Sequence, residues 1–208
     1  MLSQDIILRL IMWLPQIAAF VLAIVMWPNY KNTTQRNFRY FLGFVLVIEC
    51  LGYLLPIICD IKSGYVYNVY TIISGLFLLT WFKSILQTKR LVIVFISVFI
   101  ASIGYCLFFQ AFGVLWKIPL VVLAIAILIC STVFFSDLLT KNEVVNFKTD
   151  QKFWIVTGCL VFYIGYLPLV LLQKYFGLSG IYYRIPITIN IILMFGFIIK
   201  SFLCLKKS

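Results

Sequence analysis

One acidic residue of the sequence stands in the middle of a long apolar run. Glu49 lies within Val45–Gly52, where all of its neighbours are apolar or small. An ionisable side chain at the centre of a membrane is costly, so it marks either a functional site or a buried helix contact. Gly52, Tyr53 and Pro56 follow at i+3, i+4 and i+7, which places them on the same helix face. We expect this face to point into a helical bundle, as a binding or proton-linked site or as a hydrogen-bonded helix contact.

Polar side chains in three other apolar runs are candidates to join Glu49. Asn68 and Thr71 share one run, Asn190 lies in the last run, and Gln16 lies in the first. For each of them the alternative is a hydrogen bond that bridges two helices. The sequence predicts a polar, ligand-binding pocket in the outer half of the bundle, made of Glu49, Tyr53, Asn68, Thr71, Asn190 and Gln16.

The residue types exclude most catalytic chemistry. The sequence has no histidine, which removes histidine acid–base catalysis, Ser–His and Cys–His nucleophiles, and most transition-metal sites. The other acids near the apolar runs stand at their boundaries, so Glu49 has no second carboxylate at its depth. The six cysteines form no Cys-x-x-Cys pair and are expected to pack as small apolar residues, with a Cys59–Cys106 disulfide as the alternative. We predict a protein that is not an enzyme and holds no metal or cofactor.

Apolar runs long enough to cross a membrane dominate the 208 residues, of which 64% are hydrophobic and 11% charged. A helix needs about 20 such residues to cross the hydrocarbon core. The runs predict an all-α, seven-transmembrane-helix bundle, a single polytopic domain over residues 1–208. The predicted spans are residues 7–27, 38–59, 65–85, 91–112, 116–137, 153–173 and 185–205.

The net charge of +11 reflects basic residues that are unevenly divided between the two sides. Twelve of the seventeen fall on the side that follows the first span: Lys31, Arg36, Arg39, Lys83, Lys89, Arg90, Lys141, Lys148, Lys152, Lys200, Lys206 and Lys207. The other five are Arg9, Lys62, Lys117, Lys174 and Arg184. Short loops rich in Lys and Arg stay in the cytoplasm. We expect an outer N-terminus, a cytoplasmic C-terminus and a place in the cytoplasmic membrane, with the bases contacting anionic lipids rather than nucleic acid.

Aromatic residues gather near both predicted membrane boundaries. The set near the outer boundary is the denser one and includes Tyr65, Tyr67 and Tyr70. Tyrosine and tryptophan are usual anchors at the membrane–water interface. A tyrosine-lined outer vestibule is the alternative for this set.

Pro15-Gln16 resembles the paired motif of the PQ-loop and SWEET-type sugar transporters. Those proteins also have seven helices and an outer N-terminus, with a 3+1+3 repeat, so the resemblance implies a small-molecule transporter. The sequence departs from that pattern in its fifth span, which has Ile118-Pro119-Leu120 with no glutamine, and its two halves show no convincing match.

The function expected from these features is non-enzymatic. The segments between the spans are too short to form an output domain. We therefore expect a sensing or ligand-binding module that acts through a membrane or cytoplasmic partner protein. The alternatives are a small-molecule transporter of the PQ-loop layout and a structural subunit of a membrane complex.

Overall fold

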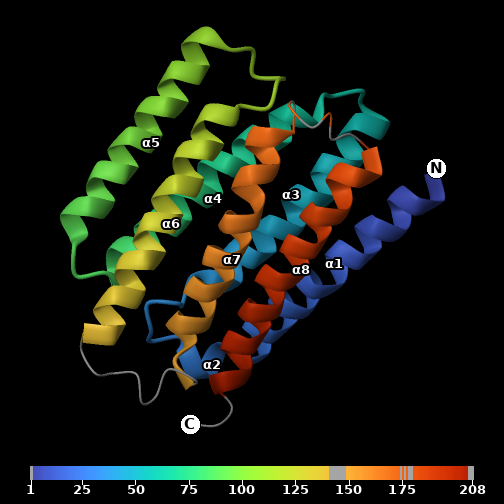
Figure 1. The fold of residues 1–208 in the computed structure, drawn as a ribbon. Helices are drawn as coiled ribbons and strands as arrows, with labels where there is room; N and C mark the ends of the chain where they lie inside the picture. The colour runs from blue at the N-terminus through green and yellow to red at the C-terminus, as the bar shows by residue number, and fades with distance from the viewer. Residues whose placement is uncertain (1, 141–148, 174, 176, 178–179, 206–208) are drawn as a thin grey trace. The chain divides into compact units, whose positions relative to one another are not determined.

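The regular elements of the chain are helices throughout the part that the structure describes (Figure 1). The structure is a computed structural model that describes the backbone of residues 2–140, 149–173, 175, 177 and 180–205, and the side chains from residue 7 on. Seven helices are long, and one is a single turn, α2 (Trp27–Tyr30). The long helices are α1 (Leu2–Val25), α3 (Phe38–Ile58), α4 (Ser63–Ile85), α5 (Lys89–Phe109), α6 (Lys117–Thr140), α7 (Gln151–Leu172) and α8 (Gly180–Cys204).

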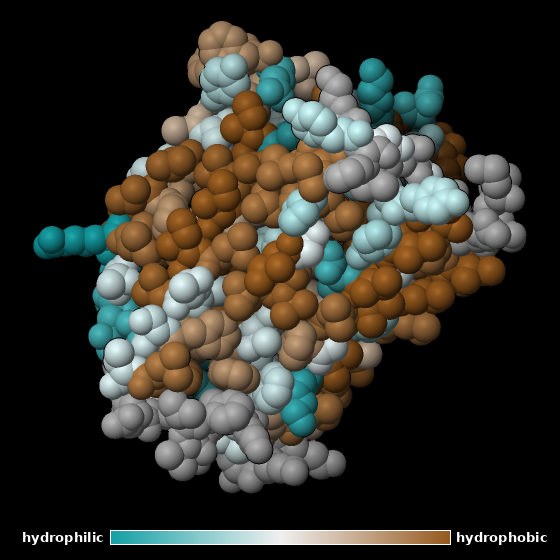
Figure 2. Space-filling view, in the orientation of Figure 1, coloured by the Kyte–Doolittle hydropathy of each residue, from teal (hydrophilic) through white to brown (hydrophobic). Residues whose placement is uncertain are grey.

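All seven long helices are long and apolar enough to cross a membrane, which confirms the predicted all-helical class and indicates an integral membrane protein. Hydrophobic side chains cover much of the surface seen in Figure 2. Leu14 is 68% exposed and Phe108 is 87% exposed, as suits side chains that face lipid rather than water. The orientation of the chain stays a prediction, and Lys141, Lys148, Lys174, Lys206 and Lys207 lie outside the described residues.

The helix ends depart from the predicted spans where the local sequence allows another structure. The first span ends at Val25, and Trp27–Tyr30 forms α2 with Pro28 in its first turn, a position where a missing N–H costs little. The fourth span ends three residues early, at Phe109. The seventh begins five residues early, at Gly180, with Pro186 inside the helix, which membrane helices tolerate.

The chain divides into two compact units, which are described separately. Unit 1 comprises Met1–Leu42 and Ser131–Ser208, and unit 2 comprises Gly43–Cys130. In unit 1, α8 packs along both α7 and α1, and in unit 2, α4 packs along α5. A single membrane domain over residues 1–208 stays a prediction.

Small residues allow the helices of unit 1 to approach closely. A Cβ atom on Gly158 of α7 would lie 3.1 Å from the Met194 carbonyl oxygen of α8, so the two backbones touch at this point. About one helical turn away, the rings of Trp154 and Phe197 stack with centroids 6.1 Å apart. At this point of their contact the two helices thus meet through a glycine and an aromatic pair.

Tyr30 joins α2 to the rest of unit 1. Its hydroxyl donates to the carbonyl of Ala23 in α1, and its ring lies 5.3 Å from the Phe202 ring, between centroids. Burial raises the pKa of Tyr30 to about 12, and the Arg39 guanidinium opposes that rise. The hydroxyl therefore remains a protonated donor at ordinary pH.

In unit 2, α3 and α4 meet through a glycine and stacked aromatic rings. A Cβ on Gly52 would lie 3.0 Å from the Tyr67 hydroxyl oxygen. The rings of Phe44 and Tyr70 stack with centroids 6.3 Å apart. Cys59 and Cys106 form no disulfide in the structure, so the alternative of a Cys59–Cys106 disulfide is wrong.

Candidate functional site: a groove in unit 2

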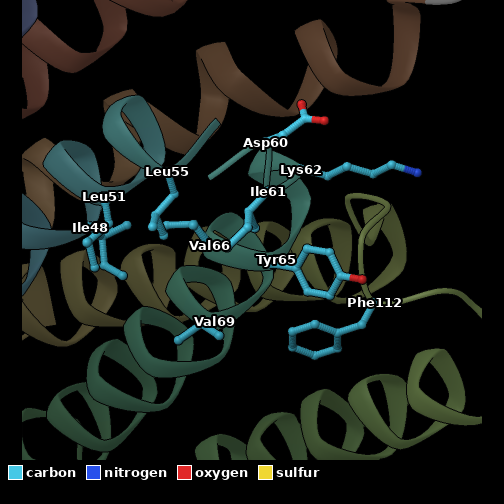
Figure 3. A pocket seen from close by; sticks show the side chains of 10 residues that line it. All are labelled: Ile48, Leu51, Leu55, Asp60, Ile61, Lys62, Tyr65, Val66, Val69 and Phe112. Atoms are coloured by element: carbon cyan, nitrogen blue, oxygen red, sulfur yellow. The ribbon is translucent and has the colours of Figure 1, made fainter. Parts of the chain in front are cut away.

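A groove of about 710 Å³ opens in unit 2 between α3, α4 and the α5–α6 connection (Figure 3). Its lining residues are Ile48, Leu51, Leu55, Asp60, Ile61, Lys62, Tyr65, Val66, Val69 and Phe112. A volume of this size is within the usual range of small-ligand sites. Apolar side chains make most of the wall, and the two charged side chains belong to the α3–α4 connection.

The apolar wall follows from helical spacing. Ile48, Leu51 and Leu55 stand at i, i+3 and i+7 of α3, so they share one face of that helix. Val66 and Val69 stand three residues apart on α4 and face the same groove. Leu51 is 38% exposed, which leaves its side chain open to an occupant of the groove.

The charged end of the groove begins where α3 stops. The Ile61 N–H donates to the Leu55 carbonyl over 3.4 Å, and Asp60 between them has a positive φ of 52°. Asp60 thus ends α3 in the left-handed conformation, which glycine usually adopts at a helix end. Aspartate tolerates that position better than most residues. The turn holds the Asp60 side chain at the end of the groove (Figure 3).

The α5–α6 connection is fastened to α4 by one asparagine. The Asn68 amide nitrogen donates to the carbonyls of Phe112 and Val114, both over 2.8 Å. Its amide oxygen accepts from the Trp116 N–H over 2.9 Å. Asn68 is 1% exposed and Trp116 is 2% exposed. Three hydrogen bonds from one buried side chain therefore fix the loop that closes this part of the groove, and they explain why α5 stops at Phe109.

Two glycines let this loop lie close to α4. A Cβ on Gly64 would overlap the Gly113 carbonyl. A Cβ on Gly113 would lie 2.9 Å from the Tyr65 ring and 3.4 Å from the Lys62 Cδ. The Lys62 stem and the Tyr65 ring thus pack against the loop backbone. This packing fixes the point from which the Lys62 side chain extends.

Four of the predicted site residues lie in unit 2, and their roles differ. Asn68 uses its amide on the loop backbone, and the Thr71 hydroxyl donates to the Tyr67 carbonyl of its own helix over 2.9 Å. Both groups are thus engaged by the protein backbone. Glu49 and Tyr53 are half-buried on α3, and Glu49 directly follows the groove residue Ile48 in sequence. A ligand contact by any of the four stays a prediction.

The other two predicted residues, Asn190 and Gln16, lie in unit 1. A Cβ on Gly165 of α7 would overlap the Asn190 amide of α8, so this asparagine packs at the α7–α8 contact. Gln16 of α1 is 2% exposed, and its amide oxygen has no hydrogen-bond partner among the described residues. The structure therefore places a buried, unsatisfied acceptor directly after Pro15.

Sequence reasoning about polar residues missed the apolar wall and the charges at its end. The i, i+3, i+7 spacing of Ile48, Leu51 and Leu55 is present in the sequence, but lipid-facing positions show the same spacing. In the sequence, Asp60 and Lys62 cannot be distinguished from charged residues that are simply exposed in a connection between helices. Tyr65 belongs to the tyrosines predicted to lie near the outer boundary, for which a vestibule is the alternative, and it lines the groove.

Searches against family models, curated proteins and solved structures found no match to this chain. Among the residues that the structure describes, no three His, Cys, Asp or Glu side chains are grouped so that they could hold a metal ion.

Proposed function

We propose that the protein is a non-enzymatic, seven-span ligand-binding or sensing module, and that its ligand occupies the α3–α4 groove. The observation that carries the proposal is the groove of about 710 Å³, with apolar walls and charges at one end. Such a shape suits an amphiphilic molecule, whose apolar part replaces lipid against the wall. The segments between the long helices are too short for an output domain, so a bound ligand acts through a partner protein.

The proposed orientation follows from the twelve-to-five division of the basic residues. With the N-terminus outside, the connection that carries Asp60 and Lys62 lies on the outer side of the cytoplasmic membrane. Reporter fusions test this directly: a reporter that is active only in the cytoplasm is inserted after Ile61 or after Gln87. We expect activity after Gln87 and none after Ile61, and the reverse pattern would overturn the orientation.

The ligand-binding proposal is tested on the purified full-length chain in mild detergent. Native mass spectrometry measures which amphiphiles remain bound to the wild type and to Leu51→Trp, which fills the groove. We expect the bound amphiphile to be lost from Leu51→Trp. Equal retention by the two proteins would overturn binding in the groove.

Glu49 is tested in the same way, with two variants that separate charge from size. Glu49→Gln keeps the hydrogen-bonding capacity, whereas Glu49→Leu removes it. If Glu49 belongs to the site, Glu49→Leu loses ligand retention while Glu49→Gln keeps part of it. A Glu49→Leu protein with wild-type thermal stability and retention would show that Glu49 is not part of the site.

A second candidate function is small-molecule transport, which the buried amide oxygen of Gln16 favours. An acceptor without a partner inside a membrane helix is costly, and a passing polar substrate would satisfy it. Uptake of labelled sugars into proteoliposomes tests this candidate, with Gln16→Leu as the inactive variant. Wild-type protein without uptake of any tested sugar would leave ligand binding, or a structural role in a membrane complex, as the function.

A further inference from the structure

The two ends of the α3–α4 groove differ in chemistry. In Figure 3, Ile48 and Leu51 lie at one end, whereas the Asp60 carboxylate and the Lys62 ammonium lie at the other. The two charged groups point in different directions. An occupant that matched both ends would need an apolar chain and a polar head that carries one charge of each sign.

We infer that the groove binds a zwitterionic phospholipid, with the headgroup ammonium at Asp60, the phosphate at Lys62 and an acyl chain along Leu51, Leu55 and Val69. This inference rests on the proposed ligand-binding function and names its ligand class. An anionic lipid would meet Lys62 favourably but would be repelled by Asp60, and a cationic amphiphile would meet the opposite problem.

The headgroup end is held in place before any ligand arrives. The turn after α3 gives the Asp60 backbone a φ of 52° and is closed by the Ile61 N–H bond to the Leu55 carbonyl, and the Lys62 stem packs against Gly113 in the loop that Asn68 anchors. A preformed backbone at this end avoids the cost of ordering the connection on binding.

The apolar walls supply affinity, and the charges supply the choice of headgroup. Burial of an acyl chain is favourable relative to water, but neighbouring lipid offers a similar apolar environment. The advantage over bulk lipid therefore comes mainly from the headgroup contacts. Because Asp60 and Lys62 are exposed, each contact changes the preference by a modest factor, roughly two- to fivefold.

The test uses full-length protein in detergent and two lipids with identical acyl chains, phosphatidylethanolamine and phosphatidylglycerol. Native mass spectrometry measures the ratio of the two bound lipids in an equimolar mixture. We expect the wild type to prefer phosphatidylethanolamine. Asp60→Asn keeps a residue that tolerates positive φ but removes the charge, and it should shift the ratio towards phosphatidylglycerol by roughly two- to fivefold. Lys62→Gln should lower the retention of both lipids, because both carry the phosphate.

Groove-filling variants separate this inference from the proposed function. Leu51→Trp and Val69→Trp fill the groove from opposite walls, and both replace partly exposed side chains. Ile57→Trp is the matched control on α3, because Ile57 is 65% exposed and does not line the groove. Loss of both lipids from the two groove variants, but not from the control, supports binding in the groove.

Two results would count against the inference in different ways. If the groove variants lose lipid but Asp60→Asn leaves the ratio unchanged, or if the wild type prefers phosphatidylglycerol, the zwitterionic assignment is overturned and the proposed function stands. If the groove variants retain lipid as the control does, the measured lipid is bound elsewhere on the protein surface. This result would overturn both the lipid inference and the proposal that a ligand binds in the groove.

Discussion

An asparagine and a glycine make a close contact in each unit, and the two contacts are built differently. In unit 2, Asn68 binds three backbone groups of the α5–α6 connection, and Gly64, one turn earlier, admits the Gly113 carbonyl. In unit 1, the Asn190 amide lies against Gly165 of the neighbouring helix. Main-chain atoms fix the first contact, whereas one rotatable side chain makes the second. The same residue types therefore form a rigid loop anchor in one unit and an adaptable helix contact in the other.

The largest expected difference comes from adding a methyl group at each glycine. Gly64→Ala places a Cβ on a backbone carbonyl that cannot turn away, so we expect a loss of about 3 kcal/mol in the free energy of unfolding, or failure to fold. Gly165→Ala meets the Asn190 side chain, which can rotate, and we expect a loss of about 1 kcal/mol. Thermal unfolding of both variants in the same detergent measures the difference. Equal losses would show that the two contacts are alike.

Alanine substitution of the two asparagines should also cost more free energy of unfolding in unit 2 than in unit 1, with a smaller difference than at the two glycines. Asn68→Ala leaves the Phe112 and Val114 carbonyls and the Trp116 N–H without their partner, for an expected loss of about 2–3 kcal/mol. Asn190→Ala should cost less than about 1 kcal/mol, in line with typical polar contacts between membrane helices.

Thr71→Val is the control for these variants. The Thr71 hydroxyl is bonded only within its own helix, so the substitution should change the melting temperature little. Hydrogen exchange at the Trp116 amide gives a second measurement, since Asn68→Ala should speed that exchange and Asn190→Ala should not. If the Trp116 amide exchanges at the wild-type rate in Asn68→Ala, Asn68 does not anchor the α5–α6 connection, and the two contacts do not differ in the way stated.

The fold was readable from the sequence because a membrane helix is defined by a long run of apolar residues. All seven spans were found within a few residues of their ends. One departure from the predicted ends has a particular cause. The α5 helix stops at Phe109, before a loop that Asn68 holds through a contact between residues more than forty positions apart. The spacing of apolar residues within one predicted span gives no information about a contact with a distant segment.

The site was harder to predict because a polar residue in a span has several ways to be satisfied. Asn68 and Thr71 were identified as buried polar residues, yet both are engaged by backbone carbonyls. The groove wall, in contrast, consists of residues such as Leu51 and Val69 that look like ordinary lipid-facing positions. Only the approach of α3 to α4 shows that these side chains line one space.

Substitution of Gln16 has the smallest expected effect on stability, and it compares a buried amide oxygen that is unpaired in the described part of the chain with the paired amide of Asn68. Asn68 is fully engaged and Asn190 is packed, whereas the Gln16 amide oxygen is buried with no partner among the described residues. Removing an unsatisfied acceptor from an apolar site should stabilise the protein, so we expect Gln16→Leu to raise the free energy of unfolding by about 0.5–1 kcal/mol.

The control for Gln16→Leu is Ser131→Ala, since the Ser131 hydroxyl is also buried with no partner in the described part of the chain. If both variants gain stability and neither changes ligand retention or uptake, the Gln16 amide oxygen and the Ser131 hydroxyl are unpaired polar groups with no functional role. If Gln16→Leu gains stability but loses an activity that Ser131→Ala keeps, the unsatisfied oxygen has been retained for a polar substrate. A loss of stability in Gln16→Leu would instead mean that the glutamine contributes to packing, and the contrast with Asn68 would disappear.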